Sequence, residues 1–235
     1  MKILALDTSG DTCSVALVSG KELLVEINFA HHRRLTERLP GIVEFALREA
    51  ELTLEELDAF AVGLGPGSFT GVRVGVTMAK TWAEVLGKRV IGVSSLDAMA
   101  SAVSGAGAPV VVVVPSRKDE VIAAFYKGGR SNPVAEPKVL LTSEVLAQAT
   151  EVLGESRLLV LGECAHWIVP NPQAVLRTAS PRAYHIARLG QARLRVQGPD
   201  DVATLAPHYV APPPIRTHPP APSLAAKEGE RGVGG

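Results

Sequence analysis

One stretch decides the fold of this chain: Gly65-Pro66-Gly67-Ser68-Phe69-Thr70-Gly71-Val72-Arg73-Val74-Gly75. It follows an apolar run, residues 59–64, that is typical of a buried strand, and it opens a proline-free segment, residues 69–86, that favours a helix. Its first two glycines allow backbone conformations closed to other residues, and Ser68 or Thr70 can cap the helix. The sequence therefore predicts a strand, a tight turn and a helix whose free N–H groups are open to an anion.

The familiar ligand-binding motifs do not fit this turn. A dinucleotide fingerprint needs its third glycine one residue before Gly71, and a P-loop needs a lysine, which does not appear before Lys80. A nucleophile elbow needs a residue between the first glycine and the serine, whereas Ser68 directly follows Gly67. The spacing favours a structural turn over a ligand cradle.

Two helices have more apolar surface than one contact needs. In the helix predicted for 69–86, apolar residues spread over about 200° of the circumference, whereas packing against one surface needs an apolar stripe of about 100°. Small residues recur at every fourth position of this helix, and the helix predicted for 35–50 has two adjoining apolar stripes. Burial inside the protein's own domain is one explanation. The alternative is a partner interface, formed by Leu35, Leu39, Ile42, Ala46, Gly71, Gly75, Ala79 and Trp82.

Composition narrows the class of protein. The chain has 235 residues, with 24 Lys and Arg against 24 Asp and Glu, so no global field attracts nucleic acid or anionic lipid. Cys13 and Cys164 are isolated, which suggests a reducing compartment. The longest aliphatic run, residues 110–114, is far shorter than a membrane span. We expect an intracellular, cytoplasmic protein.

The order of elements starts twice along the chain. Three strands in successive hairpins precede the first helix, and a similar order begins again after a Gly- and Ala-rich hinge at 104–109. Ser180-Pro181 predicts the start of a last helix. We expect three parts: an N-terminal α/β lobe with the partner-binding helices (1–104), a smaller C-terminal α/β lobe (105–210) and a disordered Pro- and Gly-rich tail (211–235).

The three opening strands with Asp7-Thr8-Ser9 at their first turn, together with the glycine-rich stretch, resemble the TsaB family over residues 1–210. The resemblance implies a two-lobed actin/Hsp70/sugar-kinase-like (ribonuclease H-like) fold with mixed sheets and a reduced second lobe. It also implies that the chain is the non-catalytic partner of a TsaD-type catalytic subunit, and that a TsaE-type ATPase completes the complex. The complex makes the threonylcarbamoyl modification of adenosine next to the tRNA anticodon.

The resemblance also implies which sites are lost. The related catalytic subunit has an H-x-x-x-H metal pair, and the aligned positions here are Ser95 and Met99, while the six histidines, with His31 and His32 adjacent, offer no substitute. We expect no metal, no catalytic residue and no cofactor bound by this chain alone, with ATP or ADP placed at an interface of the complex. From the second apolar stripe of the helices predicted for 35–50 and 69–86, we also expect the chain to form a homodimer when alone.

Compared with enzymes of the implied fold, the set of residues that would bind a nucleotide is also incomplete. Enzymes of this fold have one acidic phosphate hairpin in each lobe. Asp7, Thr8 and Ser9 keep the first, either as a remnant that orders the hairpin or as a vestigial nucleotide contact. In the second lobe Pro115 stands where the family usually has aspartate, although Arg117 is retained.

Three other functions stay open. A small-molecule kinase or ATPase of the same fold would need a metal carboxylate and a second phosphate loop. A peptidase would need a nucleophile or zinc motif, and neither H-E-x-x-H nor G-x-S-x-G occurs. A direct tRNA binder would use the basic residues of the last predicted helix, which are Arg182, Arg188, Arg193 and Arg195.

Overall fold

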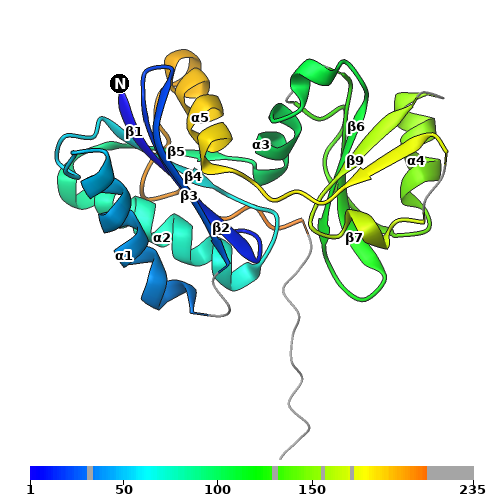
Figure 1. The fold of residues 1–235 in the computed structure, drawn as a ribbon, viewed down its shortest axis with the longest axis horizontal. Coiled ribbons are helices and arrows are strands. Elements are labelled where there is room, and N and C mark those ends of the chain that lie inside the picture. Colours follow the sequence, from blue (N-terminus) through cyan, green and yellow to red (C-terminus); the bar gives the residue numbers. More distant parts are fainter. Residues whose placement is uncertain (31–33, 129–131, 155–156, 170–171, 211–235) are drawn as a thin grey trace, which may run out of the picture.

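The computed structural model describes residues 1–30, 34–128, 132–154, 157–169 and 172–210; His31, His32 and the predicted disordered tail lie outside these ranges. Within them the chain forms two five-stranded mixed sheets, one in each lobe (Figure 1). The first sheet contains β1 (Lys2–Asp7), β2 (Thr12–Ser19), β3 (Glu22–Ala30), β4 (Ala59–Gly63) and β5 (Arg89–Val93). The second contains β6 (Val110–Pro115), β7 (Glu120–Tyr126), β8 (Lys138–Leu141), β9 (Leu158–Leu161) and β10 (Ala174–Arg177).

The two sheets have the same topology. The first runs β3-β2-β1-β4-β5 and the second runs β8-β7-β6-β9-β10. In each sheet the first three strands are antiparallel and the last two join the first in parallel. The expected α/β class with two similar lobes and mixed sheets is confirmed. The sequence reading missed β10, a strand of four residues with no buried side chain.

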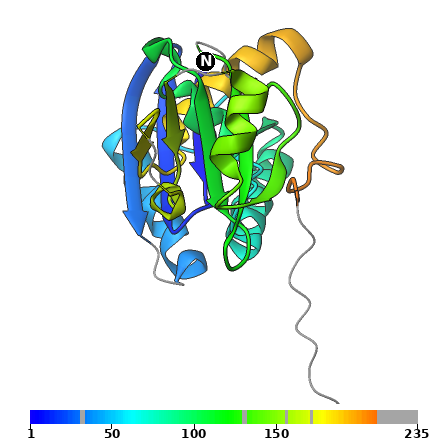
Figure 2. The same ribbon diagram turned by 90° about the vertical axis from the view of Figure 1, so that its right-hand side faces the viewer.

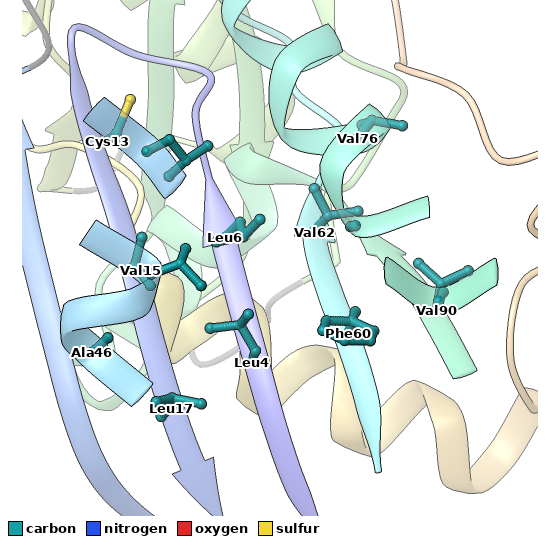
Figure 3. Close-up of a cluster of buried hydrophobic side chains, with 14 of the residues drawn as sticks. Leu4, Leu6, Cys13, Val15, Leu17, Ala46, Phe60, Val62, Val76 and Val90 are labelled. Atoms are coloured by element: carbon teal, nitrogen blue, oxygen red, sulfur yellow. The ribbon is translucent and has the colours of Figure 1, made fainter. Parts of the chain in front are cut away.

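Both faces of the first sheet are buried. The helices α1 (Leu35–Glu49) and α2 (Phe69–Leu86) cover one face. Figure 3 shows side chains of this core, among them Leu4 and Leu6 of the sheet together with Ala46 of α1 and Val76 of α2. The helix α5 (Ala183–Gln197) covers the opposite face. Because side chains alternate between the two faces of a strand, the continuous apolar run at the N-terminus supplies both cores.

The helix after the fifth strand of each sheet packs on the other sheet. The short helix α3 (Ser95–Ser101) follows β5 but packs on β6 of the second sheet. Conversely, α5 follows β10 and packs on β1 and β2. Figure 1 shows α3 between the lobes, and Figure 2 turns the second lobe with α4 (Val145–Leu153) toward the viewer. The segments 1–104 and 105–210 therefore each contain one sheet, but their last helices are exchanged.

The start predicted for the last helix is wrong by two residues. The helix begins at Ala183, and its N-cap residue, Arg182, makes no side-chain cap. Instead the hydroxyl of Ser14 accepts a bond from the Ala183 N–H at 2.8 Å, and Glu26 accepts one from the next N–H at 3.1 Å. Side chains of β2 and β3 thus satisfy the free N–H groups that a local cap would satisfy.

After α5 the chain returns along the first lobe as an extended segment, residues 198–210, which we call the strap. Asp200 bridges to Val90 at the edge of β5. Lys80 of α2 donates to the strap carbonyl of Leu205 at 2.8 Å. The strap ends beside the glycine-rich turn, where His208 donates its N–H to the Leu64 carbonyl at 2.8 Å. Among the residues that the structure describes, no helix has the length and apolar character needed to cross a membrane.

Candidate functional site

The glycine-rich stretch forms the predicted strand, turn and helix. Gly65 has φ +84°, a conformation that glycine adopts without penalty. Ser68 is the N-cap of α2, and its hydroxyl accepts a bond from the Gly71 N–H at 3.2 Å. The Ser68 N–H in turn donates to the Ser9 carbonyl at 2.6 Å. The turn is therefore tied to the hairpin between β1 and β2.

The small residues at every fourth position of α2 face inward, and we call them the α2 ridge: Gly71, Gly75, Ala79 and Ala83. A Cβ added to Gly71 would clash with the backbone carbonyl of Thr8, and one added to Gly75 would clash with the Thr8 hydroxyl. That hydroxyl donates to the Gly71 carbonyl at 2.7 Å. The ridge thus lets α2 approach the end of β1 closely, inside one chain.

The structure places most residues of the predicted partner interface inside the protein. Six of its eight residues are buried in the protein's own core, because they lie on the sides of α1 and α2 that face the sheet: Leu35, Leu39, Ala46, Gly71, Gly75 and Ala79. Ile42 and Trp82 remain partly exposed. Other apolar side chains extend this exposed surface, which we call the α1–α2 outer face: Ile42, Phe45, Val74, Met78, Trp82 and Val85.

Asp7 lies at the centre of a buried hydrogen-bond network. One carboxylate oxygen accepts bonds from the Ser9 N–H at 2.9 Å and from the Ser9 hydroxyl at 2.7 Å. The other accepts from the Ser95 hydroxyl at 2.6 Å, which itself accepts from the Gly65 N–H at 3.2 Å. Complete burial raises the pKa of Asp7, and the bonds from Ser9 and Ser95 oppose that shift. Thr8 is also fully buried.

A cavity of about 550 Å³ lies between the lobes. The first β-hairpin of each lobe lines it. The hairpin between β1 and β2 contributes Ser9 and Asp11, and the hairpin between β6 and β7 contributes Pro115 and Arg117. Most other lining side chains are apolar, which is unlike a phosphate-binding cleft. They include Pro66, Phe69, Met99, Val114, Ile122, Trp167 and Tyr209.

One wall of the cavity is an aromatic cluster that the sequence reading missed. Tyr209 of the strap stacks on Phe69 with ring centroids 5.0 Å apart, and its hydroxyl accepts a bond from Arg73 at 2.9 Å. The Arg73 guanidinium also lies 3.9 Å from the Phe69 ring centroid. Glu163 and Trp167 come from the second lobe. Phe69 and Arg73 are one helical turn apart in α2, but no local pattern links them to Tyr209, Glu163 or Trp167, which only tertiary folding brings to the same cavity.

Three of the four basic residues considered for direct tRNA contact have structural partners. Arg182 pairs with Glu26, and Arg193 pairs with Asp200. Arg188 donates to the Gly20 carbonyl at 3.2 Å. Arg195 of α5 is exposed, but with the other three residues paired the four do not form the free cationic stripe that direct tRNA binding would use. Within the described ranges, no group of three or more His, Cys, Asp or Glu residues is placed to hold a metal ion.

We predict that Ser95→Ala lowers the free energy of unfolding by about 2–3 kcal/mol at neutral pH, because it removes a buried donor to a carboxylate. Ser101→Ala, in the same helix, removes a half-buried hydroxyl that donates to the Ala98 carbonyl and lies 3.0 Å from His185 Nδ1. Because neither partner is a carboxylate, the change should cost less, about 1 kcal/mol. Urea unfolding at several pH values measures both.

The Ser95→Ala deficit should also depend on pH. Loss of the donor raises the folded-state pKa of Asp7 further above its unfolded-state value. A carboxyl with a raised pKa contributes stability that is fully present below the unfolded pKa and is lost as pH rises through the folded pKa. The deficit should therefore shrink toward pH about 4. If Ser95→Ala lowered the free energy of unfolding by the same amount at every pH, the loss of the hydroxyl would not change the pKa of Asp7.

Comparison with known proteins places these features in a family context. Residues 29–187 match a family model described as "TsaD: tRNA N6-adenosine threonylcarbamoyltransferase". An uncharacterized protein of Mycobacterium tuberculosis is 39% identical over 129 residues, which cover 54% of this chain and 60% of the relative. The chain thus spans about 60% of the length of that relative.

Two further relatives match over more of the chain. The tRNA threonylcarbamoyladenosine biosynthesis protein TsaB of Bacillus subtilis is 29% identical over 222 residues, covering 89% of this chain and 94% of the relative. The solved structure of YeaZ from Pseudomonas aeruginosa superposes with a TM-score of 0.77 at 26% sequence identity, covering 88% of this chain and 99% of that one. These matches extend over both lobes.

Proposed function

The chain belongs to the TsaB family, related to the threonylcarbamoyltransferase TsaD, and from this premise we propose that it is the non-catalytic partner subunit in threonylcarbamoyl modification of the adenosine next to the tRNA anticodon. In this role it binds and activates a TsaD-type catalytic subunit. A TsaE-type ATPase completes the assembly, tRNA is contacted through the complex, and the cytoplasm is the site of action.

The Asp7–Ser95 bond carries the non-catalytic part of this proposal. Ser95 stands where the related catalytic subunit has a metal ligand, and its hydroxyl donates to Asp7 at 2.6 Å. Met99 stands at the second ligand position, is 2% exposed and packs in the core against the second sheet. A serine bonded to a buried carboxylate and a buried thioether are poor ligands for a hard or borderline metal. The apolar lining of the cavity supports the same conclusion.

The α1–α2 outer face is the surface that we propose for the catalytic partner. Val85 is 76% exposed and Phe45 is 44% exposed, although both are apolar. Apolar residues that are contiguous on a surface commonly mark a protein interface. Arg48 lies over the Phe45 ring, 5.0 Å from its centroid, so the face also presents a cation beside an aromatic ring. We propose that the same face pairs two copies of this chain when the partner is absent.

Depletion of the chain in its own cell should lower the threonylcarbamoyladenosine content of tRNA, measured by mass spectrometry of digested tRNA. In a purified system, modification by the TsaD-type and TsaE-type subunits should require this chain, while the chain alone should modify no tRNA. A modification level that does not respond to depletion contradicts the proposal. Robust ATP turnover by the chain alone, lost in Asp7→Asn, would favour a kinase or ATPase of the same fold.

A further inference from the structure

A carboxylate of the second lobe reaches across the cleft to the first. Glu163 follows β9, and its Oε2 accepts a bond from the Asp11 N–H at 3.3 Å. Its Oε1 accepts the hydroxyl of Ser180, in the segment that leads back to the first lobe, at 2.9 Å. A Cβ added to Gly10 would clash with the same carboxylate. Glu163 therefore lies directly against the hairpin between β1 and β2.

The position of this carboxylate is set by its backbone. Gly162, the preceding residue, packs so closely on β6 that an added Cβ would clash with the Val113 carbonyl. Its N–H donates to the Arg177 carbonyl at 3.2 Å, which ties it to β10. Glu163 is thus held by the second sheet while its side chain contacts the first lobe. Burial is the main cause of the raised pKa of Asp7, and the negative charge of Glu163 adds to it.

Exposed N–H groups of a tight turn favour an anion. In this hairpin one such N–H, that of Asp11, already bonds to a carboxylate. A phosphate that approached the hairpin would compete with Glu163 for this donor and for the Ser180 hydroxyl. It would also meet a negative charge at contact distance in a partly buried site, where repulsion exceeds that in bulk water.

We propose that Glu163 is a built-in anion that occupies the anion position of the first hairpin and closes this end of the cleft to phosphate groups. The second lobe thereby supplies to the hairpin what a bound phosphate would supply. This assignment does not depend on the proposed role in tRNA modification.

Calorimetric titration of the full chain with pyrophosphate tests the proposal. Glu163→Ala removes the resident anion and should bind pyrophosphate about tenfold more tightly than wild type, or better, because two donors are freed and one like charge is lost. The matched control is Glu151→Ala, which removes an exposed carboxylate from α4 in the same lobe and should behave as wild type. A folded Glu163→Ala variant that binds pyrophosphate no more tightly than wild type overturns the proposal.

A second variant displaces the carboxylate without removing it. Gly10 has no positive φ, so Gly10→Ala is compatible with its backbone, and the new Cβ takes the place of the Glu163 carboxyl. Because the charge stays nearby, Gly10→Ala should bind pyrophosphate more tightly than wild type and less tightly than Glu163→Ala. If Glu163→Ala does not fold, the pyrophosphate affinity of Gly10→Ala is compared with that of wild type instead. Equal affinities would overturn the assignment.

Discussion

Replacing Gly71 by alanine should lower the free energy of unfolding by about 3 kcal/mol, a large effect for the addition of one methyl group. The new Cβ would clash with the backbone carbonyl of Thr8, which cannot move without shifting the end of β1. Chemical denaturation followed by circular dichroism measures the loss. The matched control is Gly41→Ala in α1, where a Cβ meets no atom within 4 Å and the change should stabilise by up to about 1 kcal/mol.

Two double-mutant cycles show whether the ridge really faces Thr8. The Cβ of Gly75→Ala would clash with the Thr8 side chain, so Thr8→Ala should relieve it, with a coupling free energy of about 1 kcal/mol or more. The Cβ of Gly71→Ala would clash with the backbone, which Thr8→Ala leaves in place. Equal coupling in both cycles, or a Gly71→Ala protein as stable as wild type, would mean that α2 is seated elsewhere.

A charge on the α1–α2 outer face should strongly weaken partner binding while leaving the chain folded. Val85 is 76% exposed, so Val85→Asp costs the isolated chain little. An unpaired carboxylate buried in an apolar interface should weaken binding of the TsaD-type subunit about 100-fold. Isothermal titration of the two purified subunits measures the change. Light scattering of the chain alone should show the loss of any homodimer formed through the same face.

The control for this experiment lies on α5. Val196 is 85% exposed, on the helix that covers the opposite side of the first sheet. Val196→Asp adds the same charge in a similar environment and should leave partner affinity unchanged. Weakening of equal size in both variants would point to a general charge effect. Unchanged affinity in Val85→Asp would place the partner on another surface.

Much of the fold could be predicted from the sequence because its signals are local. The glycine-rich stretch contains its own turn and its own helix cap, so strand, turn and helix follow from adjacent residues. The repeated order of strands likewise follows from turn residues and apolar runs. The repeat is less obvious in the second lobe, where β8, β9 and β10 have four residues each. Short strands with mixed burial give weak periodic signals, and β10 was missed for this reason.

The direction of the α2 ridge could not be predicted in the same way. Small residues at every fourth position indicate a close approach of two backbones, but they do not say which backbone approaches. The structure places Thr8, 63 residues before Gly71, against this ridge. The pattern is the same for a core contact and for a partner contact, so the sequence alone left both open. The apolar residues that remain exposed lie on the flank of the helix beside α1.

By itself, the sequence determined the class of the fold, the order of most elements and the family. These depend on local capping, periodicity and an uninterrupted motif. Tertiary structure alone decided that α3 and α5 are exchanged between the sheets, that Ser95 satisfies Asp7 and that Glu163 reaches the first hairpin. The Ser95–Asp7 bond joins residues 88 positions apart, and the Glu163–Asp11 bond joins residues 152 apart. The first contact forms when β1 and β5 join one sheet and the second when the two lobes pack together, and no local pattern of residues encodes either.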